Sequence, residues 1–206
     1  GTVHLDAQNI ATLPGWQLAA RRAVLPQASR IAFPFTVFEI VRLGLTAAAE
    51  AAGDARVSEA LARVGLAGFE GRFYQELSGG EQQRAQLARV LTQVWEPVGP
   101  DGPRWLFLDE PVSSLDIGHQ LEVMTLLSDY AKAGGGVVAV MHDLNLTAIY
   151  AQDIAMLRAG QIMRQGTPQE VLTDDVLSAA YGCPIRVGVA PQKGIPFVLP
   201  QMAGQD

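Results

Sequence analysis

The adjacent acids Asp109 and Glu110 directly follow the apolar run 105–108, which we interpret as a buried strand. Parallel strands deliver ligand-binding residues at their carboxyl ends, so both acids would face a crevice. The Asp109 carboxylate is suited to hold a hydrated Mg²⁺, and the Glu110 carboxylate to polarise an attacking water. An ordinary acidic turn after a strand is the alternative that the pair alone leaves open.

A second candidate site is the string Leu-Ser-Gly-Gly-Glu-Gln-Gln-Arg at positions 77–84. Ser78 and Glu81 have the spacing of a capping box, which predicts that a helix follows Ser78. Gly79 and Gly80 at its mouth let backbone amides approach an anion closely, and the helix dipole favours negative charge there. The string therefore indicates an anion-binding helix start, against the alternative of a glycine turn before an ordinary helix.

Three further polar residues accompany these motifs. Asp116 ends the run Ser-Ser-Leu-Asp soon after Glu110, His142 follows the apolar run 137–141, and Gln27 follows Leu25-Pro26. A lone histidine beside a buried strand is more often structural than catalytic, and the tripeptide around Gln27 is a weak signal by itself. Their significance depends on the stronger motifs around them.

The elements that position these residues follow from capping boxes and apolar periodicity. Capping boxes at 36–39, 78–81 and 167–170 predict three helix starts, the first helix running to about Leu45, and Asp54 is expected to cap another helix that ends near Gly65. Apolar runs at 105–108 and 137–141 flank an amphipathic helix, which predicts a βαβ unit in a parallel sheet. A hairpin is expected around Ala159-Gly160.

Together and in this order, the motifs resemble those of ABC ATPases. The string 77–84 is similar to the ABC signature motif, and 106–111 followed by 113–116 to the Walker B motif and D-loop. Gln27 and His142 match the Q-loop glutamine and the switch histidine. The resemblance implies an α/β fold of the P-loop NTPase type, in which a mostly parallel sheet with flanking helices carries a helical subdomain.

The resemblance also implies how the chain is divided. Residues 1–206 would form a single, partial ABC ATPase domain. Within it we expect a helical subdomain at 28–95, the second half of the catalytic core at 96–187 and an irregular tail at 188–206.

The roles that the resemblance implies place ATP and Mg²⁺ between two copies of the protein. Glu110 would be the general base, Asp109 and Gln27 would hold Mg²⁺ through water, and His142 together with Gln27 would sense the γ-phosphate. Each copy would lend its signature loop to the phosphate site of the other, and Asp116 would couple the two sites. The nucleotide-binding set is then Gln27, Ser78, Gly79, Gly80, Glu81, Asp109 and Asp116.

One family motif is not found in these residues. The sequence contains no Gly-x-x-x-x-Gly-Lys-Ser/Thr string, and no lysine precedes Lys132. In the family this Walker A loop lies upstream of the Q-loop, so we expect it before Gly1 and expect the given chain to be truncated and inactive by itself. The alternative is a catalytically dead interaction module that has lost nucleotide binding.

The segments 29–37 and 196–200 resemble those of ATPase subunits of bacterial haem importers. This resemblance implies a homodimer at the cytoplasmic face of the inner membrane, an integral membrane permease, and a periplasmic haem-binding protein that acts indirectly. Siderophore-iron and cobalamin importers remain alternatives. Phe33 and Phe35 would either dock the permease or pack in the core.

Composition limits the other function classes. The 206 residues carry 15 basic and 21 acidic side chains, a net charge of −6, and no dense Lys/Arg run, so we expect no nucleic-acid partner. This argues against an ABC ATPase that acts on DNA or ribosomes. Every apolar stretch is too short for a membrane span. The histidines are scattered and Cys183 is alone, so no metal-ligand spacing appears.

Overall fold

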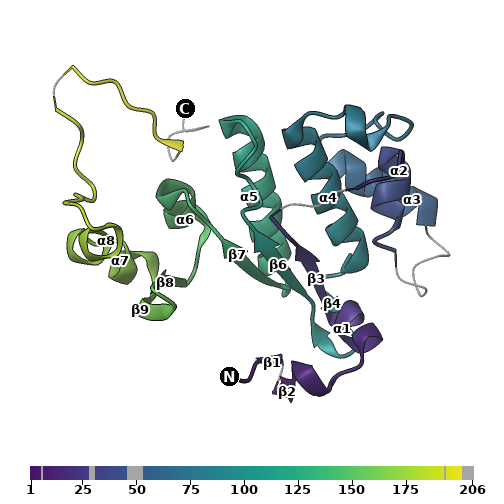
Figure 1. Cartoon of the computed structure of the whole chain (residues 1–206), viewed down its shortest axis with the longest axis horizontal. Coiled ribbons are helices and arrows are strands. Elements are labelled where there is room, and N and C mark those ends of the chain that lie inside the picture. The colour runs from purple at the N-terminus through teal and green to yellow at the C-terminus, as the bar shows by residue number, and fades with distance from the viewer. Residues whose placement is uncertain (6, 28–30, 46–52, 193, 201–206) are drawn as a thin grey trace. The chain divides into compact units, whose positions relative to one another are not determined.

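The computed structural model describes residues 1–5, 7–27, 31–45, 53–192 and 194–200 (Figure 1). It consists of two compact units, Gly1–Val140 and Met141–Asp206. Ser29 and Arg30, which belong to the segment that resembles haem importers, lie outside the described residues.

The centre of the first unit is a parallel sheet with the strand order β3-β6-β7. Strands β3 (Arg22–Leu25), β6 (Trp105–Asp109) and β7 (Gly136–Val140) are in register, with Leu25 beside Leu108. The predicted parallel βαβ unit is therefore confirmed. Its carboxyl edge carries Asp109, as the sequence predicts.

The two faces of this sheet differ in burial. Ala23, Leu106 and Leu108 are buried on the face that packs against α4 (Gly79–Gln93) and α5 (Ile117–Lys132). On the opposite face the side chains of Val24, Val138 and Val140 are 46%, 46% and 52% exposed.

Three helices of the first unit pack on one another: α2 (Val37–Arg42), α3 (Gly53–Arg63) and α4. They lie in the range predicted to be helical, and the capping boxes that begin α2 and α4 are both present. Two boundaries differ from the prediction. Helix α2 ends at Arg42, before Leu45, and Asp54 lies in the first turn of α3 because that helix already includes Gly53. The buried faces of these helices carry Val37, Ile40, Val57, Leu61, Ala85 and Ala88.

Shorter elements surround the sheet of the first unit. Strands β1 (His4–Leu5) and β2 (Gln8–Asn9) form an antiparallel pair, and so do β4 (Val98–Gly99) and β5 (Gly102–Pro103). Helix α1 (Gly15–Arg21) was not predicted. Its N-cap residue, Pro14, makes no side-chain hydrogen bond, so the sequence lacks the usual signal of a helix start. The described part of this unit also contains the 3₁₀ helices η1 (Ile10–Thr12) and η3 (Tyr74–Glu76).

The second unit contains the predicted hairpin, β8 (Ile154–Arg158) and β9 (Gln161–Gly166), followed by α7 (Pro168–Val171) with its capping box. Helices α6 (Leu144–Tyr150) and α8 (Asp174–Tyr181) were not predicted. The described residues after Tyr181 form no α-helix and no β-strand. In the described ranges of the whole chain, no helix has both the length and the apolar character needed to cross a bilayer.

Candidate active site

Glu110 lies directly after β6 and has an unusual backbone conformation. Its φ angle is +50°, in the left-handed region that residues other than glycine enter at an energetic cost. The Glu110 N–H donates to the Val140 carbonyl at 3.1 Å. The Glu110 carbonyl accepts from Gln83 Nε2 at 2.7 Å and from the Ser113 hydroxyl at 3.2 Å. These neighbours hold both peptide groups of Glu110, and so they stabilise the costly conformation.

The side chain of Glu110 meets the predicted Q-loop glutamine. Gln27 Nε2 donates to Glu110 Oε1 at 2.8 Å, although the two residues are 83 positions apart in the chain. The contact follows from the parallel register, because Leu25 lies beside Leu108 and both strands end at the same edge of the sheet. The structure therefore brings together two residues that the sequence assigned to one site.

Asp109 is the last residue of β6, pairs in register with Val140 and is exposed. In the ranges that the structure describes, no group of three or more His, Cys, Asp or Glu side chains could hold a metal ion. A cation at Asp109 would therefore take further ligands from other oxygens, such as those of water or a nucleotide.

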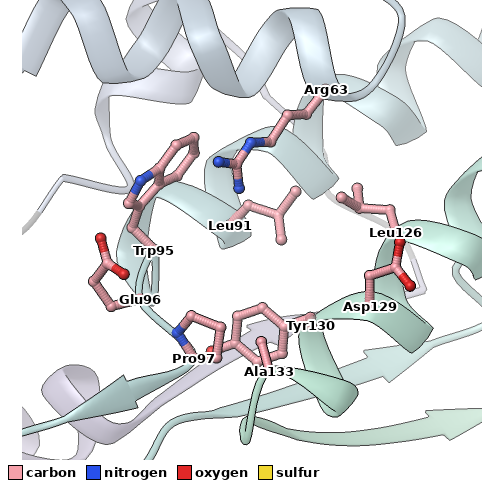
Figure 2. Close-up of a pocket in the computed structure, with 9 residues that line it drawn as sticks. All are labelled: Arg63, Leu91, Trp95, Glu96, Pro97, Leu126, Asp129, Tyr130 and Ala133. Atoms are coloured by element: carbon pink, nitrogen blue, oxygen red, sulfur yellow. The ribbon is translucent and has the colours of Figure 1, made fainter.

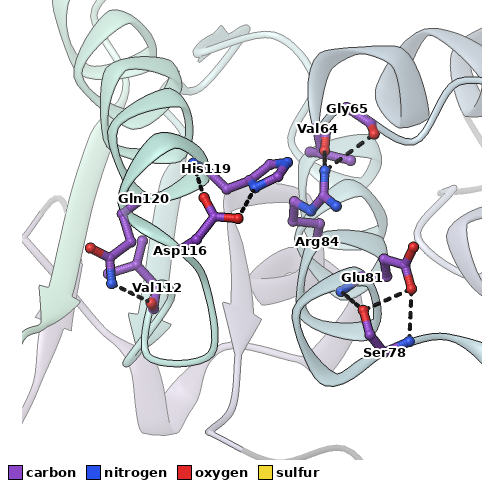
Figure 3. Close-up of polar contacts among 9 residues, drawn as sticks. All are labelled: Val64, Gly65, Ser78, Glu81, Arg84, Val112, Asp116, His119 and Gln120. Carbon is purple, nitrogen blue, oxygen red and sulfur yellow. Dashed lines mark hydrogen bonds and ion pairs between the residues drawn. The ribbon is translucent and has the colours of Figure 1, made fainter. Parts of the chain in front are cut away.

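The start of α4 is fixed by the capping box between Ser78 and Glu81 (Figure 3). The Ser78 N–H and hydroxyl both donate to Glu81 Oε2 at 2.7 Å, and the Glu81 N–H donates to the Ser78 hydroxyl at 3.3 Å. Hydrogen bonds from the Ser78 hydroxyl and then from its N–H lower the pKa of Glu81 below 4.5. The Glu81 carboxylate therefore orders the loop that was predicted to bind phosphate.

The first turns of α4 contact the segment after Glu110. A Cβ on Gly80 would lie 2.9 Å from the Ser114 carbonyl oxygen, so only a glycine fits at this approach. One turn further along the helix, Gln83 Oε1 accepts from the Ser114 N–H at 3.1 Å. No separate role was predicted for Gln83, although it belongs to the signature string. Its spacing of three from Gly80, which places both on one side of the helix, is the signal that could have identified it.

Asp116 is the N-cap of α5, so its side chain has a local structural role. Its Oδ1 accepts from the His119 N–H at 3.0 Å, and its Oδ2 lies 2.8 Å from the His119 ring Nδ1 (Figure 3). The hydrogen bonds from the His119 backbone and then from its ring lower the pKa of Asp116. His119 was not predicted as part of this arrangement.

The last residue of the signature string, Arg84, is buried. Its Nη1 donates to the carbonyl oxygens of Val64 and Gly65 at 3.0 and 3.1 Å, just beyond the end of α3 (Figure 3). A cation is favourable at the C-terminal end of a helix. Arg84 therefore connects the end of α3 to α4, the helix that begins at the signature loop.

His142 belongs to the second unit and is exposed. The next residue, Asp143, is the N-cap of α6 and accepts from the N–H groups of Asn145 and Leu146 at 2.8 and 2.9 Å. The backbone beside His142 is thus fixed by a helix start within its own unit.

A pocket of about 260 Å³ lies elsewhere in the first unit (Figure 2). It is lined by residues of α3, α4 and α5 and by Trp95, whose ring lies 4.0 Å from the Arg63 guanidinium carbon. None of the predicted site residues lines it. The candidate active site is instead the edge of the sheet at Asp109 and Glu110, where Gln27 contacts Glu110, together with the start of α4, which Gln83 connects to Glu110 and Ser114.

The chain is similar to proteins of known family. Residues 1–113 match the family model for ABC transporters. The chain is 63% identical over 203 residues to the hemin import ATP-binding protein HmuV of Jannaschia sp. strain CCS1, covering 98% of this chain and 75% of that protein. It is 58% identical over 205 residues to the HmuV protein of Rhizobium meliloti strain 1021, covering 98% of this chain and 78% of that protein.

A solved structure shows the same fold. It is a dimeric ATP-binding cassette in a post-hydrolysis state, bound to ADP and Pi. The TM-score is 0.69 at 26% identity, and the match covers 82% of this chain and 73% of that one. Since the family model matches more than half of the chain and the relatives match nearly all of it, the chain belongs to the ABC transporter family, among its ATP-hydrolysing subunits.

Proposed function

We propose that this chain powers the import of haem through a membrane permease by hydrolysing ATP. The observation that supports the catalytic part is the 2.8 Å hydrogen bond between Gln27 and Glu110, which joins two motifs from distant parts of the chain at one edge of the sheet. The haem cargo is supported by the relatives, which are hemin import ATP-binding proteins at 54–63% identity.

In this proposal the Glu110 carboxylate is the general base that takes the proton of the attacking water. Gln27 orients it, since the amide nitrogen of Gln27 donates to one carboxylate oxygen. A base held by a fixed donor needs little reorganisation when the reaction occurs, which favours hydrolysis. His142 is proposed to sense the γ-phosphate.

The oxygens at the sheet edge suit a hard cation such as Mg²⁺. Asp109 offers a carboxylate, and Gln27 offers its amide oxygen because its nitrogen is already committed to Glu110. Mg²⁺ usually takes one or two carboxylates and completes its shell with water and substrate phosphates, which agrees with a sheet edge that has no metal cluster among the described residues. When bound, the ion would neutralise charge on the phosphates of ATP.

The start of α4 is proposed to serve the nucleotide of a second copy. Ser78, Gly79 and Gly80 begin a helix of 15 residues, and unpaired N–H groups together with the helix dipole favour an anion there. The similar cassette bound to ADP and Pi is dimeric, which supports a homodimer. Asp116 would couple the two sites.

The permease is proposed to dock at the segment that follows the Q-loop. The Phe33 side chain is 69% exposed, and its ring meets that of Phe35 edge-on with centroids 6.4 Å apart. We place the assembled protein at the cytoplasmic face of the bacterial inner membrane, where a periplasmic haem-binding protein would deliver cargo to the permease. Uptake of siderophore-iron or cobalamin remains the second candidate, because those importers are relatives of haem importers.

The catalytic part is tested in a longer protein, in which a Walker A segment precedes Gly1. We refer to it as the joined protein, and the test variant is Glu110→Gln. The amide cannot accept the proton, so turnover should fall by about 10²–10⁴-fold while ATP still binds and the ATP-bound dimer accumulates. Steady-state hydrolysis and size-exclusion chromatography with ATP measure these effects. The control is Glu122→Gln, the same chemical change at an exposed position of α5.

The same proteins, reconstituted with a haem permease in vesicles, test the cargo. Haem should accumulate with the wild type and not with Glu110→Gln. Hydrolysis by Glu110→Gln at the wild-type rate would show that Glu110 is not the base. Uptake of siderophore-iron or cobalamin in place of haem, with the corresponding permease, would replace the proposed cargo and leave the catalytic assignment intact.

A further inference from the structure

Gln83 connects α4 to the catalytic segment through both ends of its side-chain amide. The amide nitrogen donates to the Glu110 carbonyl at 2.7 Å, and the amide oxygen accepts from the Ser114 N–H at 3.1 Å. The side chain is half-buried, which limits competition from water. Because one rigid group makes both contacts, the distance between the start of α4 and the segment 110–114 is fixed.

A second contact strengthens this connection. Gly80, one turn before Gln83, approaches the Ser114 carbonyl so closely that a Cβ would lie 2.9 Å from its oxygen. Both residues belong to a continuous helix that begins at the Ser78–Glu81 capping box. A displacement of the signature loop must therefore move Ser114 and the Glu110 carbonyl with it, since a packed helix shifts as a unit.

Glu110 is sensitive to such a displacement because its conformation depends on neighbouring groups. A φ of +50° is costly for a residue with a side chain and persists where surrounding contacts enforce it. The Val140 carbonyl fixes the N–H side of the residue, and Gln83 holds the carbonyl side with a shorter hydrogen bond than those from Ser113. Without Gln83, the Glu110 carbonyl loses its shortest hydrogen bond and keeps only the longer ones from Ser113, so the alignment of the carboxylate with Gln27 is weakened.

We infer that Gln83 is a positioning residue that links the signature loop of a chain to the catalytic glutamate of the same chain. The inference rests on the proposed function, in which the start of α4 binds the nucleotide of the partner copy and Glu110 acts on the nucleotide of its own chain. When the signature loop of one chain binds the partner's ATP, it then aligns Glu110 of the same chain, which acts on that chain's own ATP. The two sites of the dimer therefore hydrolyse ATP cooperatively.

The first test is Gln83→Met in the joined protein. Methionine has a similar length but neither polar end. Loss of two neutral hydrogen bonds that act on the base should lower kcat by about tenfold to a hundredfold. The KM for ATP should change little, and the Hill coefficient for ATP should fall towards one. Initial rates over a range of ATP concentrations measure all three.

A second variant, Gln83→Glu, tests the link through the pH dependence of kcat, which a purely structural role of Gln83 would not change. The ionised carboxylate still accepts from Ser114 N–H but repels the Glu110 carbonyl, since both are acceptors. The protonated acid donates to that carbonyl again. The ratio of its kcat to that of the wild type should therefore rise as the pH falls through the pKa of the introduced carboxyl.

The matched control is Gln93→Met near the other end of α4. Gln93 Nε2 also makes two hydrogen bonds, to the Ala19 and Arg22 carbonyls at 3.0 and 2.9 Å, but these do not involve the catalytic segment. Its kcat and Hill coefficient should equal those of the wild type. Thermal melts of all three variants confirm that they are folded under the assay conditions.

Three results would overturn the inference: wild-type kcat and Hill coefficient in Gln83→Met, equal losses in Gln83→Met and Gln93→Met, or a flat pH ratio for Gln83→Glu. If Glu110→Gln is inactive while Gln83→Met is normal, the link fails and the proposed base stands. If Glu110→Gln is fully active, the proposed base fails, and the link to it fails for that reason.

Discussion

At the scale of single residues, the carboxylates of this chain divide into two kinds of environment. Glu110 sits in a left-handed backbone conformation and accepts from Gln27, in an arrangement that orients its carboxylate. Glu81 and Asp116 instead accept from groups at the start of their own helices, which lowers the pKa of each. A residue in a functional motif can therefore act by fixing the backbone that presents the motif.

The capping role of Glu81 predicts a pH-dependent stability. Its pKa is lowered in the folded chain, so the ionised carboxylate stabilises the fold above the unfolded pKa near 4.5, and this contribution is lost as the pH falls through the lower folded value. Glu81→Gln should lower the Tm of the chain by about 1–4 °C at pH 7.

The difference in Tm between the wild type and Glu81→Gln should shrink as the pH falls below about 4.5, because the wild-type carboxyl is then protonated as well. Thermal melts by circular dichroism at several pH values measure this. Glu122→Gln, at an exposed position in α5, should show no such pattern. A Tm difference that stays constant down to pH 3 would contradict the capping role.

At the scale of elements, the segment before α2 combines a fixed backbone with an exposed aromatic side chain. The Phe35 carbonyl accepts from the Tyr74 N–H at 2.9 Å, and the Val37 N–H donates to the Arg72 carbonyl at 2.9 Å. Phe33 is mostly exposed, while Phe35 is half-buried. The two phenylalanines therefore have different environments, which single substitutions can separate.

If Phe33 contacts the permease, Phe33→Ser should leave the Tm of the joined protein and its rate of ATP hydrolysis without the permease equal to those of the wild type. Surface substitutions usually change stability little. Haem uptake in vesicles should fall, since coupling to the membrane protein would be weakened. Trp16→Ser is the control, because Trp16 is also an exposed aromatic residue, at 72%. Normal uptake by Phe33→Ser would refute docking at this residue.

At the scale of the whole molecule, the first unit presents an apolar sheet face to solvent. Strands of parallel sheets are normally covered on both faces, and here α4 and α5 cover one of them. Val24, Val138 and Val140 on the other face are about half-exposed, and such surfaces promote association. The solution behaviour of the chain should depend on this face.

Replacing Val24, Val138 and Val140 together by Thr keeps the β-branched shape and adds hydroxyls that water can solvate. We expect less binding of a hydrophobic dye and less self-association, with a Tm change of about 4 °C or less because the side chains are only partly buried. Dye fluorescence and sedimentation velocity test this. Unchanged dye binding would mean that the face is covered in solution.

The amino-acid sequence by itself determined the family and the local elements. The capping boxes at Thr36, Ser78 and Thr167 all form as predicted, because Ser or Thr followed three residues later by Glu can satisfy the free N–H groups of a helix start through local contacts. The strands at 105–109 and 136–140 follow from apolar runs too short for helices. Helices α1, α6 and α8 were missed, because each has seven or eight residues and too few turns for a clear apolar period.

Only the tertiary structure decided which distant residues meet. Gln27 reaches Glu110 because β3 and β6 are neighbours in register, and no local pattern encodes that pairing. The bridge from Gln83 to Glu110 and Ser114, and the fit of Gly80 against Ser114, likewise depend on how α4 packs beside the sheet. Short-range hydrogen bonds are fixed by spacing along the chain, whereas contacts across many residues depend on the packing of whole elements.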